Sequence, residues 1–241
     1  MDFNYDIIVV GGGHAGCEAA HAAAVMCAKT LLVTMDMTKL AQMSCNPAMG
    51  GIAKGQIVRE IDALGGMSGL VTDRSMIQFR MLNKSKGAAM WSPRAQCDRQ
   101  KFTSEWRKAI EKTNNLGIWQ EQAKSLSLDG NKVNGVETSF GTRFRAKAVI
   151  LTNGTFLNGL MHIGFKKITG GRSGDQASTG LSEQLEKIGF SIERMKTGTS
   201  ARIDGRSIDF SEMTEQRGDD EGRSFSYLDK VTNIMEQKSC Y

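Results

Sequence analysis

Three glycines with the spacing of a phosphate-binding turn follow the short apolar run Tyr5–Val10: Gly11, Gly13 and Gly16. In a G-x-G-x-x-G pattern the first glycine permits a sharp turn, the second lets the backbone approach a pyrophosphate, and the third lets a helix pack closely on a strand. The Ala-rich stretch that follows predicts a helix, whose N-terminal N–H groups attract phosphate oxygens. The pattern therefore predicts a dinucleotide-binding turn.

A single cysteine, Cys45, lies in the stretch MSCNPAMGGIAKGQ (43–56), between a predicted turn and a predicted helix. A thiolate is a nucleophile, and a helix N-terminus or a cation such as Lys54 would lower the thiol pKa enough to form it. The alternative is a small residue chosen for packing. Cys17, Cys27 and Cys97 fall on predicted helices and are interpreted as structural.

The composition limits the other classes of site. Five cysteines without a CxxC pair favour free thiols over a disulfide framework, and three scattered histidines predict no metal site. The net charge of +5 is compatible with a polyanionic partner. Six basic residues are candidates for phosphate contacts, those of NKSKG (83–87) first among them: Lys54, Arg59, Arg80, Lys84, Lys86 and Arg94.

The elements around the glycine turn predict an α/β fold. A strand over 5–10, a helix and a strand over 31–34 form a βαβ unit. Short strands over 117–146 predict a β-meander, and the apolar run 148–152 predicts a strand that returns to the parallel sheet. This insertion favours FAD over NAD. The acidic residue expected at the end of the second strand is replaced by Thr34, with Asp36 two residues later, so the ribose contact is left open between them.

Further elements are predicted outside this unit. Apolar periodicity predicts a helix over 52–64, alternation predicts a strand over 76–82, and Ser92-Pro93 is interpreted as the start of a helix that runs to Lys112. A helix over 181–188 and a strand over 191–196 follow. The polar region after Gly198 predicts a domain boundary, with an FAD-binding domain over 1–200 and the start of a second, truncated domain over 201–241. The apolar run 7–10 is too short for a membrane span, and no targeting signal is visible, so we expect a cytoplasmic protein without membrane association.

Seven blocks together resemble the MnmG (GidA) family from residue 5 to about residue 212. Because these blocks are long and specific, a chance match is very rare. The blocks are GGGHAGCEAA, MSCNPAMGGIAKGQIVREIDALGG, IQFRMLNKSKG, RAQCDR, FRAKAVILTNGTFLNG, GGRSGD and MKTGTSARIDGRSIDFS. The resemblance implies a Rossmann-like FAD-binding domain of the glutathione-reductase type with an inserted β-meander.

The resemblance also implies an activity. Members of the family are FAD-dependent enzymes that, with an MnmE-type GTPase, add an aminomethyl or carboxymethylaminomethyl group to C5 of the wobble uridine of tRNA. Methylenetetrahydrofolate is the one-carbon donor, reduced flavin is the hydride donor, and NADH reduces the flavin. The complete protein is expected to be a homodimer, and this chain a catalytically incomplete part of it.

The resemblance assigns site residues by position. Cys45 matches one of two functionally important cysteines of the family; the other lies beyond residue 241, and Cys240 does not match it. The positions that match FAD contacts are Gly11, Gly12, Gly13, His14, Ala15, Gly16, Ala123 and Ser178. Two alternatives remain open at this point, a folate- and FAD-dependent tRNA uracil-5-methyltransferase and a non-catalytic FAD-binding fragment.

Overall fold

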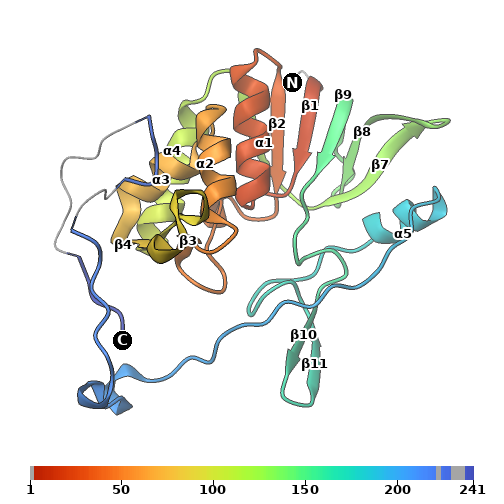
Figure 1. Ribbon diagram of the computed structural model, residues 1–241. Coiled ribbons are helices and arrows are strands. Elements are labelled where there is room, and N and C mark those ends of the chain that lie inside the picture. Colours follow the sequence, from red (N-terminus) through yellow and green to blue (C-terminus); the bar gives the residue numbers. More distant parts are fainter. Residues whose placement is uncertain (1–2, 221–223, 229–236) are drawn as a thin grey trace. The chain divides into compact units, whose positions relative to one another are not determined.

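The computed structural model describes residues 3–220, 224–228 and 237–241 (Figure 1). The chain divides into two compact units, which we call unit 1 (residues 1–41 and 107–196) and unit 2 (residues 42–106 and 197–241). One junction, at 196–197, lies near the boundary expected at residue 200, whereas residues 42–106 group with the C-terminal region. The division into functional domains stays a prediction.

Unit 1 is built on a sheet in the order β6-β2-β1-β9-β8-β7. The first four strands of that order are parallel, and β8 and β7 continue the sheet antiparallel as the meander. Because β2 is buried along its whole length, it carries apolar residues at consecutive positions, as a central parallel strand requires. The strands are β1 (Asn4–Val10), β2 (Thr30–Thr34), β6 (Leu116–Gln120), β7 (Ala123–Asp129), β8 (Lys132–Thr138) and β9 (Arg143–Leu151).

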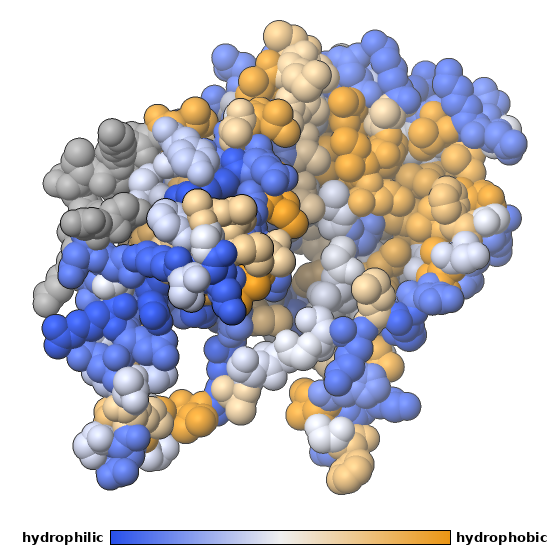
Figure 2. Space-filling model, viewed as in Figure 1, coloured by the Kyte–Doolittle hydropathy of each residue, from blue (hydrophilic) through white to orange (hydrophobic). Residues whose placement is uncertain are grey.

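Helix α1 (His14–Val25) lies against this sheet (Figure 1). Its buried residues are small, which brings the helix axis close to the strands: Gly16, Cys17, Ala20, Ala23 and Ala24. Figure 2 shows hydrophobic residues over strands that α1 leaves uncovered in this view. A separate apolar cluster, centred on Phe144, joins β1 and β2 to the meander. Unit 1 is completed by η1 (Met37–Lys39), the hairpin of β10 (Leu160–Ile163) and β11 (Lys166–Thr169), and α5 (Leu181–Lys187).

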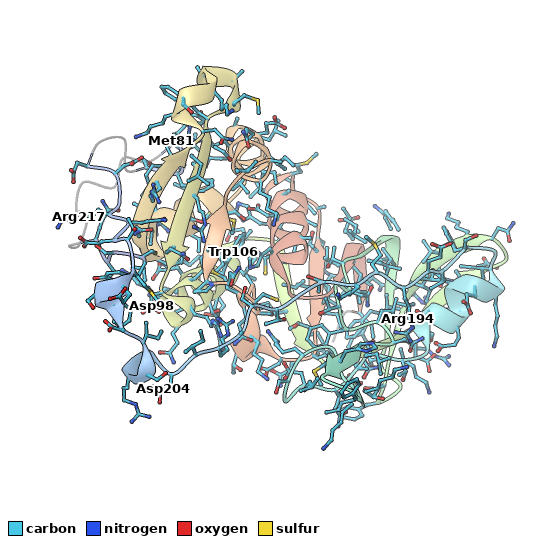
Figure 3. All side chains as sticks on the ribbon, turned by 60° about the horizontal axis from the view of Figure 1, so that its bottom comes forward. Met81, Asp98, Trp106, Arg194, Asp204 and Arg217 are labelled. Carbon is cyan, nitrogen blue, oxygen red and sulfur yellow. The ribbon has the colours of Figure 1, made fainter. Side chains whose placement is uncertain are left out.

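Unit 2 contains a three-stranded antiparallel sheet in the order β3-β5-β4. The segment that carries Arg217 runs past β4, which carries Met81 (Figure 3). There the N–H of Asp219 donates to the carbonyl of Phe79 at 2.8 Å, and the N–H of Met81 donates to the Asp219 carboxylate at 2.7 Å. This edge of the sheet is therefore covered by the chain itself, which satisfies its backbone groups.

The elements of unit 2 are short and lie in two stretches of the chain. They are β3 (Ala48–Gly50), α2 (Gly55–Ala63), α3 (Ser68–Ser75), β4 (Met76–Leu82), η2 (Lys84–Lys86), η3 (Ala88–Met90), β5 (Ser92–Cys97), η4 (Gly205–Ser207) and η5 (Phe210–Glu212). Helix α4 (Arg99–Lys112) begins in unit 2 and ends in unit 1.

The fold class predicted from sequence is confirmed, and two local predictions are wrong. Residues 92–97 form strand β5 instead of the first turns of a helix, because pairing with β3 and β4 outweighs the local preference of Pro93 for a helix start. Helix α4 begins after Asp98, whose carboxylate accepts the N–H of Lys101 at 2.8 Å as an N-cap. The strand predicted over 191–196 does not form; that segment has no regular secondary structure.

Other predicted elements are present with small changes of boundary. The strand over 76–82 and the helix over 181–188 are found as β4 and α5, and the helix predicted over 52–64 is α2. Ile57 on α2 is more than half exposed, so the apolar positions that predicted this helix are not all core positions. Within the described residues, none of the helices has the length and apolar character that crossing a membrane requires.

Candidate functional site

The glycine turn between β1 and α1 uses two of its glycines for backbone geometry. Gly11 has a φ of +108°, and a Cβ at this position would lie 2.5 Å from the carbonyl oxygen of Thr152. A Cβ on Gly16 would lie 1.7 Å from the carbonyl oxygen of Gly11. The hydroxyl of Thr152 donates to the carbonyls of Val10 and Gly11 at 2.8 and 3.0 Å. The turn is therefore packed so tightly that side chains at residues 11 and 16 are excluded.

The turn is open at Gly13 instead. A Cβ on Gly13 would meet no described heavy atom within 4 Å, and both Gly13 and Ala15 are exposed. Gly13 is also the N-cap of α1 and supplies no side-chain acceptor to the first turn of the helix. The bare backbone and the helix N-terminus form a cradle with positive electrostatic potential, which fits a pyrophosphate group.

The register of the parallel strands brings further site residues to the same edge of the sheet. Val10 pairs with Val33 and with Leu151, and Thr34 pairs with Gln120, so β1, β2, β6 and β9 all end at this edge. In open α/β sheets, ligands bind outside the carboxyl ends of parallel strands. The glycine turn and Thr34 are therefore neighbours along this edge, and the N–H of Glu121, two residues before β7, donates to the carbonyl of Thr34 at 2.8 Å.

The two candidates for the ribose contact differ in their surroundings. Thr34 is buried, and its Oγ1 would lie 2.6 Å from a Cβ on Gly12. The Asp36 carboxylate accepts the N–H and the hydroxyl of Thr38 at 2.8 and 2.6 Å and pairs with Lys39 at 3.2 Å. These interactions, the hydroxyl of Thr38 first, hold the pKa of Asp36 below its ordinary value. Asp36 is thus ionised and already engaged, while Thr34 lies directly behind the glycine turn.

Lys39 also connects this edge to the GGRSGD block (170–175). Its Nζ lies 2.5 Å from Asp175, whose other carboxylate oxygen lies 2.6 Å from Nε of Arg172. Burial raises the pKa of Asp175, but the hydrogen bonds from Lys39 and Arg172 outweigh it and lower the pKa overall. Sequence reasoning missed this pair of bridges, because Lys39 and Asp175 lie 136 residues apart.

Ala123 and Ser178, the other two predicted FAD contacts, both lie in unit 1 and are both buried. Ala123 is the first residue of β7 and belongs to the Phe144 cluster. Ser178 forms a short parallel bridge with Leu157, and its N–H donates to the carbonyl of Phe156 at 2.8 Å. Each has a small side chain within a strand or an isolated β-bridge of unit 1.

His14 and Cys17, on the first turn and a half of α1, are poor candidates for acid–base chemistry. Burial lowers the pKa of His14, and the hydrogen bond to the backbone of Ala41 only partly opposes this shift. Burial raises the pKa of Cys17 to about 12. His14 is therefore neutral near neutral pH, and Cys17 is a packing residue, as predicted from its place on the helix.

Cys45 lies in unit 2, where a segment distant in sequence contacts it. Its Sγ lies 3.7 Å from the hydroxyl of Thr199, and the Arg202 guanidinium donates to its carbonyl oxygen. Strand β3 separates Cys45 from α2, so the direct entry from this loop into a helix that the sequence predicted is wrong. The MKTGTSARIDGRSIDFS block (195–211) thus supplies both described partners, which spacing in the sequence could not reveal.

Three of the six basic candidates are already engaged within unit 2. Arg59 binds the segment 224–227, Arg80 donates to Gln216 at 2.6 Å, and Lys84 pairs with Asp219 at 2.9 Å. Lys84 keeps more than half of its side chain exposed, so it can still reach an anion in solution. Cys97 is the last residue of strand β5, so the prediction that it falls on a helix is wrong. Burial raises the pKa of Cys97 to about 12, in agreement with a structural role.

The sheet order, the meander and the glycine turn give unit 1 an α/β fold of the Rossmann type. The chain belongs to the GidA family: the family described as "Glucose inhibited division protein A" matches residues 6–241. The family resemblance stated from the sequence blocks is confirmed.

Relatives in several bacteria carry one name. The chain is 61% identical over 237 residues to a protein of Flavobacterium johnsoniae and 61% identical over 241 residues to one of Parabacteroides distasonis. Both are named "tRNA uridine 5-carboxymethylaminomethyl modification enzyme MnmG". The alignments cover 98% and 100% of this chain but only 38% and 39% of the relatives.

Solved structures agree with this assignment. GidA of Aquifex aeolicus in its form II crystal has a TM-score of 0.92 at 46% identity, over 98% of this chain and 40% of that one. A GidA-related protein from Thermus thermophilus has a TM-score of 0.59 at 23% identity, over 79% of this chain and 71% of that one. The second likeness shows the fold alone.

Proposed function

We propose that this chain is the FAD-binding part of an enzyme that modifies C5 of the wobble uridine in tRNA. The observation that carries the proposal is the open cradle at Gly13, set between two sterically closed glycines at the carboxyl edge of the sheet. Membership of the GidA family and the names of the relatives support the reaction. Because the chain spans about two fifths of those relatives, the activity belongs to the complete protein.

Each residue of the cofactor site has a role in this proposal. The backbone of Gly11, Gly12, Gly13, His14, Ala15 and Gly16 holds the FAD pyrophosphate at the N-terminus of α1. Thr34 or Asp36 faces the ribose, and Ala123 and Ser178 contribute backbone surface to the nucleotide. When bound and reduced, the flavin supplies a hydride to the one-carbon unit on C5 of the uracil.

Cys45 is the proposed catalytic residue. Its thiolate adds to C6 of the uracil, and the electron pair of the C5–C6 double bond then makes C5 nucleophilic toward the one-carbon unit of methylenetetrahydrofolate. Loss of the C5 proton later expels the thiolate and restores the double bond. A protective or relay role of Cys45 beside the flavin is the alternative.

The partners follow from the family. We propose that the complete protein binds tRNA, acts with an MnmE-type GTPase, accepts electrons from NADH and forms a homodimer in the cytoplasm. Lys84 and Lys86, on η2, are the proposed phosphate contacts within this chain. Two alternatives have different readouts: a tRNA uracil-5-methyltransferase leaves a methyl group at C5, and a non-catalytic fragment binds FAD without modifying tRNA.

The test of the cofactor site is a flavin titration of this chain, followed by quenching of FAD fluorescence. Gly13→Glu places a negative charge in the cradle and is expected to abolish binding. Gly205→Glu is the matched control, because a Cβ there also meets no described atom within 4 Å, while the residue lies on η4 in unit 2. Equal affinity of the two variants would overturn the assignment of the cradle.

The reaction is tested in the complete protein with tRNA, methylenetetrahydrofolate, an amine donor and the GTPase. Nucleoside analysis of the product distinguishes an aminomethyl-type group from a methyl group at C5. A product with a C5 methyl group would support the methyltransferase alternative, and an unchanged tRNA with intact FAD binding would support the non-catalytic one.

A further inference from the structure

Two buried carboxylates of unit 2 bind one short segment, Ser224–Tyr227. Asp62, on α2, is fully buried, and Asp73, on α3, is 4% exposed. Asp73 accepts the N–H groups of Phe225 and Ser226 at 2.6 and 2.9 Å and the hydroxyl of Ser224 at 2.9 Å. Asp62 accepts the hydroxyl of Ser226 at 2.6 Å and the N–H of Tyr227 at 2.9 Å.

Arg59 binds the same segment through carbonyl oxygens, whereas the two acids bind its donor groups. Its guanidinium donates to the carbonyls of Phe225 and Ser224 at 3.3 and 3.2 Å and lies 4.7 Å from the centre of the Tyr227 ring. Two carbonyl oxygens of the segment thus face the guanidinium, and three of its N–H groups face the two acidic side chains. Contacts to the backbone in this arrangement fix one register of the segment, since a shift by one residue would place carbonyls against the carboxylates.

Two glycines make room for the bound segment. A Cβ on Gly69 would lie 2.6 Å from Oδ1 of Asp62 and 3.3 Å from Cβ of Ser226. A Cβ on Gly50 would lie 2.9 Å from the ring of Phe225, which is fully buried. We call the residues that hold this segment the seat. The seat consists of the two acids on α2 and α3 and of the glycine backbone at Gly69 on α3 and Gly50 on β3.

Gly50 connects this seat to Cys45. It is the last residue of β3, which begins three residues after Cys45 and stands at one end of the three-stranded sheet. We propose that Asp62 and Asp73 are positioning residues for Cys45: by holding Phe225 against Gly50 they fix β3 and, through it, the loop that carries the thiol. The effect on catalysis rests on the proposed function of Cys45. The structural connection from Phe225 through Gly50 and β3 to the loop does not depend on that function.

The electrostatics explain why the seat depends on its hydrogen bonds. The pKa of Asp73 lies above its ordinary value: burial raises it most, the hydrogen bonds from Phe225, Ser226 and Ser224 only partly oppose this shift, and the nearby charge of Asp62 raises it further. The charge of Asp73 in turn contributes to the raised pKa of Cys97. Polar groups that are taken out of water need hydrogen-bond partners, and the donors described for both carboxyl groups come from the segment 224–227. An amide in place of either acid turns an NH₂ group toward N–H donors and weakens the seat.

The test is residue-specific alkylation of the cysteines in the intact chain, with iodoacetamide as the probe and mass spectrometry of the peptides as the readout. Asp73→Asn is expected to speed alkylation of Cys45 roughly tenfold, the ratio that corresponds to about 1.4 kcal/mol of local opening. Cys27, exposed in unit 1, is an internal reference whose rate is expected to stay unchanged. Asp209→Asn is the matched control, because it makes the same charge change in unit 2 and Asn caps η5 equally well.

A second variant tests the link itself. Phe225→Ala leaves both carboxylates and the backbone bonds of the segment but removes the ring from Gly50, and it is expected to raise the Cys45 rate as Asp73→Asn does. Hydrogen exchange then locates the change, with faster exchange expected at 45–50 and at 224–227 and none in β1 and β9. An unchanged Cys45 rate in either variant, or faster exchange throughout the chain, would overturn the proposal. None of these readouts needs FAD or tRNA, so failure here is distinct from failure of the proposed function.

Discussion

A Cβ on Gly16 would lie 1.7 Å from the carbonyl oxygen of Gly11, within the same turn. The carbonyl of Gly11 leaves no room for a side chain at Gly16, and the carbonyl of Thr152 leaves none at Gly11, while Gly13 between them borders open space. Two of the three glycines are required by the fold, and one is left free for a ligand. Within this one motif, substitutions at Gly11 or Gly16 are therefore expected to affect the stability of the fold, and substitutions at Gly13 the binding of the ligand.

Gly16→Ala is expected to destabilise the chain by about 1–3 kcal/mol, since the methyl group must push the start of α1 away from β1. Gly13→Ala is expected to cost at most about 1 kcal/mol, the effect of alanine at an N-cap, and to weaken FAD binding by filling the cradle. Urea denaturation followed by circular dichroism measures the first effect, and flavin titration the second. Equal destabilisation by the two variants would contradict the geometry.

Glu121 is a buried acid that ties the end of β6 to the turn before β9. It is 7% exposed and accepts the indole N–H of Trp119 at 3.0 Å and the N–H of Phe140 at 2.5 Å. Glu121→Gln turns an amide NH₂ toward these donors, so a loss of about 1–3 kcal/mol of unfolding free energy is expected. Glu186→Gln, on the helix α5, is the control and is expected to change stability by less than about 0.5 kcal/mol.

The same residue gives a pH dependence with a definite sign. Burial raises the pKa of Glu121, but its hydrogen bonds, that of Trp119 first, lower it overall below the ordinary 4.5. A lowered carboxyl pKa stabilises the folded state above pH 4.5, and this contribution is lost as the pH falls through the folded-state pKa. Denaturation midpoints measured downward from about pH 5 are therefore expected to fall more steeply in the wild type than in Glu121→Gln. Parallel curves would mean that the carboxylate carries no such stabilisation.

His14 has the corresponding effect at higher pH. Burial holds its pKa below the ordinary 6.5, so the folded state resists protonation more than the unfolded chain does. Its contribution to stability is present above pH 6.5 and is lost as the pH falls below that value. A comparison of stability at about pH 7.5 and about pH 5.5 is expected to show a drop in the wild type that is smaller in His14→Gln. An equal drop in both would assign the effect to other groups.

The sequence predicted most accurately those parts whose signals are local. The unit from β1 to β2 was predicted because strand, glycine turn and helix follow each other within about thirty residues. Strand β5 was missed because Pro93 and the polar residues after it have a local preference that only the pairing with β3 and β4 overrides. The Asp62–Ser226 contact joins residues 164 positions apart, and we find no sequence pattern that predicts it.

The same distinction applies to the candidate site. The pyrophosphate cradle is a local motif, and the structure places its glycines as their spacing requires. The surroundings of Cys45 are non-local: Thr199 and Arg202 approach it from 154 and 157 positions away. Cysteine chemistry depends on neighbours of this kind, so the sequence alone could name the residue but not the groups that act on it.

The role of Cys45 can be tested by the smallest change that removes its sulfur. Cys45→Ser in the complete protein is expected to retain FAD, because the cradle of unit 1 is built without this residue. The rate of tRNA modification is expected to fall at least about a hundredfold, since a serine hydroxyl near neutral pH is a far weaker nucleophile than a thiolate.

Cys27→Ser is the control, as its thiol is exposed and its described hydrogen bond goes to the nearby carbonyl of Val25. Single-turnover assays with nucleoside analysis measure the loss, and bound flavin is measured by absorbance in the same samples. If Cys45→Ser modifies tRNA at the wild-type rate, Cys45 is a structural residue; if it loses FAD as well, the loop around Cys45 contributes to cofactor binding and the two roles cannot be separated by this residue.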